Sequence, residues 1–213
     1  MLFTCSGGFL VAYFRTDQRS HQAADMGILL AFAPFVVFAV VDRLIGSTVG
    51  LFAAAVTSAS LLAWDWVSPD KKPKILEIGT TVLFCGLAIY AFVIQPAWTI
   101  IGVRLRVDVG LLIIVLITMI VGQPFTLQYA KERVAPEFWQ HPEFIRTNYI
   151  ITAVWALAFL ILVLAELTLL YLPNVPPRVG ILATIAALIG AVKFTSWYPE
   201  RRKAAVGPPA AGG

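Results

Sequence analysis

The segment of sequence that decides the fold class covers residues 149–172 and reads YIITAVWALAFLILVLAELTLLYL. Its only charged residue is Glu166. A helix of this length rises about 36 Å at 1.5 Å per residue, which is enough to cross the hydrocarbon core of a bilayer. The segment therefore predicts a transmembrane helix.

Five more apolar segments lie on either side of it. They cover residues 26–41, 44–67, 75–94, 109–130 and 179–197. The first is short and contains Pro34, and the fourth is interrupted by Gln123 and Pro124. Most of them approach the roughly 20 residues that a membrane-spanning helix requires. The pattern predicts an all-α polytopic membrane protein with about six transmembrane helices, in a membrane domain of residues 26–198.

The composition excludes a water-soluble fold. Of 213 residues, 59% are hydrophobic and only 13% are charged, about half the charged share of soluble proteins. A soluble domain of this size could not cover so much apolar surface. The formal net charge of +4 is explained by the basic cytoplasmic loops that membrane proteins have. We therefore expect the lipid bilayer as a partner and no nucleic acid.

The two ends of the chain differ from the membrane domain. An apolar stretch of residues 1–14 precedes the first charges, which is the reverse of a cleavable signal peptide, and it is short for a span. We therefore interpret residues 1–25 as an interfacial segment. Residues 199–213 end in Ala, Gly and Pro without periodicity, which predicts a disordered tail.

The basic residues predict the orientation. With six spans, 11 of the 16 Lys and Arg residues lie on the side that holds both termini, and four lie on the other side. Because basic loops face the cytoplasm, both termini are expected to be cytoplasmic, which in a bacterium means an inner-membrane protein. The 11 residues are Arg15, Arg19, Lys71, Lys72, Lys74, Lys131, Arg133, Arg146, Arg201, Arg202 and Lys203.

Two ionisable residues lie well within predicted spans, Glu166 and Lys193. They are expected at different depths, about 25 Å and about 8 Å from the cytoplasmic face, so they do not pair. Lys193 is close enough to extend its ammonium to the headgroups. Glu166 is either a structural ion pair or hydrogen-bonded acid, or it takes part in proton or cation movement.

The other candidate polar residues lie at the edges of spans. Asp42 with Arg43, and Arg104 with Arg106 and Asp108, flank short connections and are expected as solvated loop residues. Gln123 precedes a proline that frees a backbone carbonyl, which predicts a kink. The candidate intramembrane polar site consists of Glu166, Gln123, Arg104, Arg106 and Asp108.

Small residues recur at steps of four in the second segment, and such positions form one stripe on a helix. The stripe consists of Gly46, Gly50, Ala54 and Ser58. A small-residue stripe lets another backbone approach closely. The contact is either internal packing within one monomer or a dimer seam.

Residues 131–148 form the longest cytoplasmic connection and alternate apolar with charged side chains. Such a composition is typical of an interfacial segment. A docking surface for another protein is the alternative interpretation.

Signatures of catalysis are missing from the sequence. Its two histidines, His21 and His141, lie outside the spans, so a haem held between helices by paired histidines is not expected. No metal-ligand spacing, phosphate-binding loop or nucleophile-serine motif is present. Cys5 and Cys85 suggest no disulfide framework. We expect neither an enzyme nor a cofactor.

Several short stretches carry a resemblance to a known family. They are Ala33-Pro34-Phe35-Val36-Val37-Phe38, Gly50-Leu51-Phe52-Ala53-Ala54-Ala55-Val56, Phe84-Cys85-Gly86-Leu87, and the interval from Asn148 to Trp155. In these stretches and in layout, residues 28–200 resemble the intracellular septation protein A family of bacterial inner-membrane proteins. The resemblance implies a role in cell-envelope maintenance or cell division through membrane-protein partners or self-association.

Two functions are therefore expected. The first is an inner-membrane scaffold or accessory protein in the cell envelope. The alternative is a small proton- or cation-coupled transporter that uses Glu166.

Overall fold

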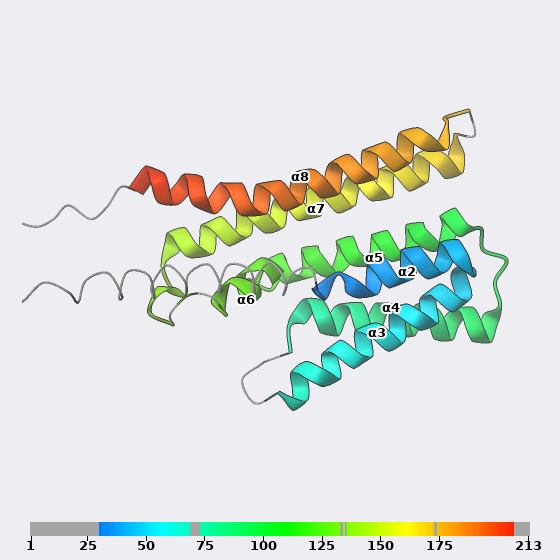
Figure 1. Cartoon of the computed structure of the whole chain (residues 1–213), viewed down its shortest axis with the longest axis horizontal. Helices are drawn as coiled ribbons and strands as arrows, with labels where there is room; N and C mark the ends of the chain where they lie inside the picture. Colours follow the sequence, from blue (N-terminus) through cyan, green and yellow to red (C-terminus); the bar gives the residue numbers. More distant parts are fainter. Residues whose placement is uncertain (1–29, 69–72, 133, 135, 173, 207–213) are drawn as a thin grey trace, which may run out of the picture.

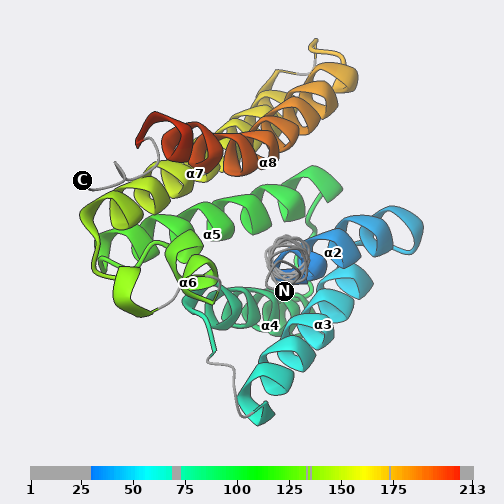
Figure 2. The same ribbon diagram turned by 60° about the vertical axis from the view of Figure 1, so that its left-hand side comes forward.

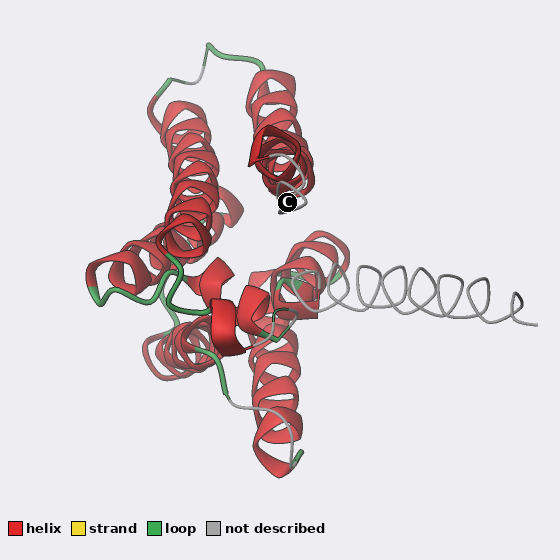
Figure 3. Cartoon of the chain, turned by 90° about the vertical axis from the view of Figure 1, so that its left-hand side faces the viewer, coloured by secondary structure: helices red, strands yellow, loops and turns green. Residues whose placement is uncertain are grey.

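The computed structural model describes residues 30–68, 73–132, 134, 136–172 and 174–206. Within these residues the regular structure is helical, and no strand is present (Figure 3). The helices pack side by side as a bundle (Figure 1). The all-α fold class that the sequence predicts is confirmed for this part of the chain.

Seven α-helices and one short 3₁₀ turn make up the described fold. They are α2 (Ala33–Leu44), α3 (Ser47–Val67), α4 (Ile75–Ile94), α5 (Ile100–Ile120), α6 (Phe125–Lys131), η1 (Pro136–Phe138), α7 (Pro142–Tyr171) and α8 (Pro177–Val206). Helix α5 lies centrally, with α7 and then α8 on one side and α4 and then α3 on the other (Figure 2). Helix α2 packs on α3.

Within the residues that the structure describes, the number of clear spans is smaller than six. Four helices, α3, α4, α7 and α8, are long and apolar enough to cross a membrane. A fifth span exists if α5 and α6, which meet at a bend of 68°, count as one broken span. The expected first span coincides with α2, whose 12 residues rise only about 18 Å.

The bundle has two ends, which we name by the basic residue at each. The Lys74 end holds the α3–α4 and α6–α7 connections and the C-terminal end of α8 (Figure 1). The Arg104 end holds the α2–α3, α4–α5 and α7–α8 connections. Helix α2 begins near the middle of the bundle and runs towards the Arg104 end (Figure 1).

The break between α5 and α6 is a hydrogen-bonded turn. Gly122 adopts a φ of 78°, its N–H donates to Met119 O at 3.1 Å, and the Gln123 N–H donates to Thr118 O at 2.9 Å. This pair of bonds is a Schellman motif, which satisfies carbonyls that a helix end leaves free. Pro124 follows and prevents α5 from continuing. The predicted kink at Gln123–Pro124 is therefore a complete helix break.

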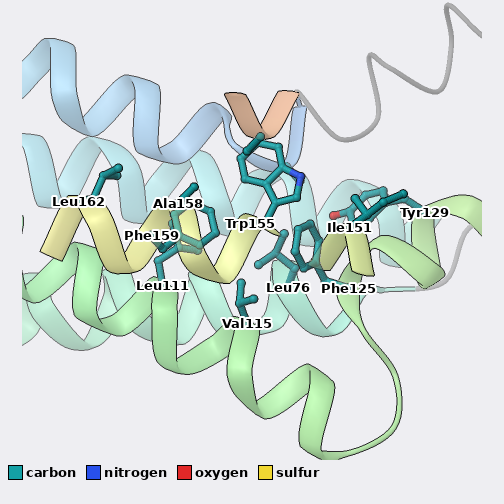
Figure 4. Packing of buried hydrophobic residues seen from close by; sticks show 12 residues of the cluster. Leu76, Leu111, Val115, Phe125, Tyr129, Ile151, Trp155, Ala158, Phe159 and Leu162 are labelled. Atoms are coloured by element: carbon teal, nitrogen blue, oxygen red, sulfur yellow. The ribbon is translucent and has the colours of Figure 1, made fainter. Parts of the chain in front are cut away.

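Helix α6 is anchored to α7 by buried hydroxyl groups. Thr126 Oγ1 lies 2.7 Å from Thr152 Oγ1 and donates to Asn148 O at 2.9 Å. Apolar side chains from α4, α5, α6 and α7 complete this part of the core, with Trp155 at its centre (Figure 4). Trp155 Nε1 donates to Thr195 Oγ1 at 2.9 Å and so joins α7 to α8.

Two helix boundaries correct the sequence-based expectations. Helix α5 begins at Ile100 rather than near residue 109. The charged residues Arg104, Arg106 and Asp108, which were expected in a connection, therefore lie inside the helix. Helix α8 continues to Val206, beyond residue 199, where a disordered tail was expected to begin. The expected interfacial segment of residues 1–25 and residues 207–213 lie outside the described residues.

The small-residue stripe of α3 faces the interior of the monomer. Gly50, Ala54 and Ser58 are all buried. A Cβ on Gly50 would lie 3.0 Å from the backbone nitrogen of Asp42 and 3.2 Å from its Cα. Gly46 is the N-cap of α3, with a φ of 133° and open space around it. The stripe thus sets the close approach of α2 to α3, and Gly46 allows the tight turn between them.

We predict that Gly50→Leu lowers the stability of the detergent-solubilised protein by about 1–3 kcal/mol, because the side chain collides with the backbone of α2. Thermal unfolding followed by size-exclusion chromatography measures the effect. Gly86→Leu is the matched control, because a Cβ there meets nothing within 4 Å. Equal melting temperatures for the two variants would contradict the proposed close packing of α2 on α3.

Candidate functional site

Buried and partly buried charges form two clusters at opposite ends of the bundle. The Arg104 cluster consists of Asp42, Ser47, Arg104, Asp108 and Glu166. The Lys74 cluster consists of Asp65, Lys74, Glu77, Tyr129 and Glu132. Charged groups within a membrane domain are costly and mark functional sites by default, so both clusters are candidates.

Asp42 is the most deeply buried member of the Arg104 cluster, with 0% of its side chain exposed. Its Oδ2 accepts hydrogen bonds from Nε and Nη2 of Arg104 at 3.0 Å and 2.7 Å. Its Oδ1 accepts one from Ser47 Oγ at 2.5 Å. Both carboxylate oxygens are satisfied, and the contacts join α2, the start of α3, and α5.

Two further carboxyl groups face the same arginine. Asp108 interacts electrostatically with Glu166 and with Arg104, and Glu166 interacts with Arg104 and Asp42. Asp108 lies one turn after Arg104 on α5, and Glu166 projects from α7. Three carboxyl groups therefore lie within electrostatic range of one guanidinium, and the direct contact described above is that of Asp42.

The other two members of the sequence-predicted site lie apart from this cluster. Arg106 turns back along α5, where its Nη1 donates to Gly102 O at 2.6 Å and its guanidinium lies 4.5 Å from the ring centroid of Trp98. Gln123 lies in the α5–α6 break and accepts a weak hydrogen bond of 3.4 Å from Gln128. The structure thus brings together Arg104, Asp108 and Glu166 but not Arg106 or Gln123.

The expectation that Asp42 and Arg104 are solvated loop residues is wrong. Asp42 lies within α2, and Arg104 has only 28% of its side chain exposed. A signal for this burial exists in the sequence, because Pro34, Phe38 and Asp42 follow one another at steps of four and share one helix face. All three are buried in α2.

The Lys74 cluster is built around a single ammonium group. Lys74 Nζ lies 2.9 Å from Glu132 Oε1, 3.3 Å from Asp65 Oδ2 and 3.3 Å from Glu77 Oε1. It also lies 4.8 Å from the ring centroid of Tyr129. Its side chain is 7% exposed. The ammonium therefore holds the ends of α3, α4 and α6 together.

Hydrogen bonds from α6 reinforce the cluster. Tyr129 OH donates to Glu77 Oε1 at 3.1 Å. Gln128 Oε1 accepts the backbone N–H of Ile75 at 2.8 Å, which satisfies a donor at the first turn of α4. The Lys74 N–H donates to Glu77 Oε2 at 3.3 Å. Helix α6 thus serves as a cap on the N-terminus of α4.

The charges around Lys74 determine its protonation. Burial alone would lower the pKa of the ammonium, but the hydrogen bond to Glu132 and the negative charges of Glu77, Glu132 and Asp65 outweigh burial and raise the pKa above 10.5. Lys74 is therefore a permanent cation at physiological pH. Its electrostatic contribution to stability is complete below pH 10.5 and is lost as the pH rises through the higher folded-state pKa.

Sequence reasoning missed the Lys74 cluster. Lys74 counts there only as one of several basic residues in a loop, and Asp65 and Glu77 lie within a residue or two of span ends, where charges are ordinary. The partner from α6 becomes recognisable only after the helix break places residues 125–132 against the start of α4. Tyr129 lies three residues after Thr126 and four after Phe125, so the three side chains share the buried face of this short helix.

A cavity of about 300 Å³ adjoins the Lys74 cluster. Its wall includes Asp65, Lys74, Glu77 and Glu132, and it reaches along the helices to Ser58 and Thr80. A second cavity of about 310 Å³ lies at the Arg104 end and is lined by Ser47, Thr48, Gln95 and Trp98 among others. Within the described residues no three His, Cys, Asp or Glu side chains are placed to hold a metal ion.

Comparisons of the chain with protein-family models, with curated proteins and with solved structures found no match. The candidate sites therefore stand on the geometry described above.

We predict that Lys74→Gln lowers the melting temperature at neutral pH by about 8 °C, because three carboxylates lose their shared cation. The difference between wild type and variant should stay constant from neutral pH to about pH 10 and shrink at higher pH, as the wild-type ammonium loses its proton. Thermal unfolding at several pH values measures both quantities. Lys193→Gln is the matched control, because Lys193 is exposed. A difference that is the same at pH 7 and above pH 11 would contradict an electrostatic role.

Proposed function

We propose that this protein moves protons or small cations across a membrane, with Glu166 and Asp108 as the carboxyl groups that bind and release the proton. The observation that carries the proposal is that α5 packs on α7 and places Asp108 and Glu166, which are 58 positions apart in the sequence, within electrostatic range of each other and of Arg104. Ionisable groups are placed inside membrane domains mainly where they serve an ion pathway.

The chemistry of the cluster suits a reversible change of charge. Asp42 and Arg104 satisfy each other directly, so the pair carries no net charge. Glu166 and Asp108 lie beside this pair, and two neighbouring carboxyl groups share protons more readily than they both ionise. Arg104 stabilises whichever carboxylate is ionised, which lowers the cost of releasing one proton at a time.

The helix architecture supports a transport function. The α5–α6 pair is bent by 68°, as in a broken span or a re-entrant loop, and α2 is a short helix that begins near the middle of the bundle (Figure 1). Interrupted helices at membrane depth are typical of transporters, where freed backbone groups line a pathway. Apolar side chains, with Phe38, Leu51 and Phe84 among them, separate the two charge clusters. This separation favours a carrier that exposes its site to one side at a time over an open channel.

We further propose a bacterial inner-membrane location with the Lys74 end in the cytoplasm. Nine of the 16 Lys and Arg residues lie in or beside the α3–α4 and α6–α7 connections or near the C-terminal end of α8 in the sequence, which supports this orientation through the positive-inside rule. We assign no catalytic activity and no cofactor to the chain.

A second proposal is an accessory role in cell-envelope maintenance or septation through partner proteins. The resemblance of residues 28–200 to the intracellular septation protein A family supports it. In the described part of the connection between α6 and α7, Trp139 Nε1 donates to Val134 O at 2.8 Å and Lys131 Nζ lies 5.7 Å from the Trp139 ring centroid. This connection would serve as the contact with a partner.

We predict that Glu166→Gln and Asp108→Asn each abolish proton flux, because an amide cannot bind and release the proton. The assay uses purified protein in liposomes that contain a pH-sensitive dye, with an imposed pH gradient or an imposed sodium or potassium gradient. Glu200→Gln is the matched control, because Glu200 is an exposed carboxylate on α8.

The proposal requires flux by wild type and by Glu200→Gln. Equal flux from wild type and Glu166→Gln would overturn the role of Glu166. If folded wild-type protein moves neither protons nor alkali cations, the transport proposal fails and the partner-based proposal takes its place.

A further inference from the structure

The cavity at the Lys74 end extends from that end of the bundle towards its middle. At its outer part lie Trp64, Asp65 and Glu132. At its inner part lie Ser58, Thr80 and Pro34, from α3, α4 and α2. On α3 the lining residues run from Asp65 to Ser58, so the cavity extends about 10 Å along that helix.

The wall of the cavity carries an excess of negative charge. Three carboxylates, from Asp65, Glu77 and Glu132, line it together with the single ammonium of Lys74. Because Lys74 stays protonated, the wall has more acidic than basic groups when the carboxylates are ionised. A cleft lined by one sign of charge concentrates ions of the other sign.

A thin apolar layer closes the inner end of the cavity. The next helical turn beyond Pro34, Ser58 and Thr80 contains Phe38, Ala54 and Phe84, all of them buried. The ring of Phe84 lies 4.9 Å from that of Phe35 and 6.0 Å from that of Phe38, measured between centroids.

The Arg104 cluster lies directly beyond this layer. Asp42 follows Pro34 by eight residues on α2, a separation of about 12 Å along the helix. A polar cavity and a buried carboxylate–arginine pair are therefore separated by the thickness of about two helical turns.

We propose that this cavity is a water-filled vestibule that concentrates cations and ends at Phe38 and Phe84. The vestibule gives protons or inorganic cations access from the Lys74 end to the apolar layer in front of the Arg104 cluster. Its part in transport rests on the proposed function, whereas its hydration and charge selectivity do not depend on it.

Cysteine accessibility in the full-length protein, reconstituted in liposomes, tests the vestibule. Cys5 and Cys85 are first replaced by Ser. Single cysteines are then introduced as Ser58→Cys and Thr80→Cys, at the inner part of the cavity. The matched controls are Ala54→Cys and Ala88→Cys, one or two turns further along the same helices. They are as buried as Ser58 and Thr80, but they do not line the cavity. Each variant is treated with a cationic and an anionic methanethiosulfonate reagent of similar size.

The expected result is modification of the two cavity cysteines at least about tenfold faster than the controls, because the reaction requires a hydrated thiolate. The cationic reagent should react about tenfold faster than the anionic reagent at these positions. Glu132→Gln should reduce this preference, since Glu132 is the half-exposed carboxylate of the wall. Phe84→Ala should make Ala54→Cys reactive by opening the apolar layer.

Unreactive cysteines at both Ser58 and Thr80 in folded protein would overturn the proposal, because the cavity would then be dry. Equal rates for the two reagents would overturn its selectivity for cations. Either result leaves the flux assay intact, so a failure of the vestibule is distinguishable from a failure of transport. Size-exclusion profiles of each variant confirm that the protein tested is folded.

Discussion

One ammonium group, on Lys74, holds three helix ends in place. In water such an ion pair contributes little, because water screens it and the side chains lose entropy. At the end of a membrane bundle, with its side chain 7% exposed, the same group must satisfy carboxylates that would otherwise be buried without a cation. The position of α6, the cap on α4 and the shape of the adjoining cavity all depend on that contact. The apolar surface of the helices supplies no comparable constraint, since lipid solvates it as well as another helix does.

The fold class and the candidate site were predictable from the sequence to different extents. Long apolar runs are decisive for helices in a membrane, so α3, α4, α7 and α8 each cover most of a predicted segment, although α7 begins at Pro142 rather than at residue 149 and α8 ends at Val206 rather than at residue 197. The start of α5 was missed because Arg104, Arg106 and Asp108 interrupt the apolar run. A charged side chain is unfavourable in a membrane-spanning helix mainly where it faces lipid. The sequence alone does not show which charges face lipid and which pair with another helix. The break at Gln123–Pro124 is different, because proline acts on its own backbone and needs no partner.

In the polar site too, some residues were recognisable from the sequence and others only from the packing of the helices. Glu166 stands out because it is alone in an apolar run, and its convergence with Arg104 and Asp108 comes from the packing of α5 on α7. Asp42 did not stand out, since Arg43 follows it directly and adjacent opposite charges usually lie in solvated loops. The direction in which each side chain leaves the helix decides whether it is buried or exposed. Asp42 continues the buried face of Pro34 and Phe38, whereas Arg43 is exposed.

The pairing of Asp42 with Arg104 has a consequence for biosynthesis. The two residues are 62 positions apart, so ribosomes that add about 5–20 residues per second complete Arg104 roughly 3–12 s after Asp42. Over that interval α2 carries an acidic group without its cation, and a 12-residue helix is too short to be retained by hydrophobicity alone. We therefore expect α2 to reach its final position only after α5 has been synthesised, when Arg104 becomes available to Asp42. The order in which the helices reach their final positions would then differ from the order in which they are synthesised.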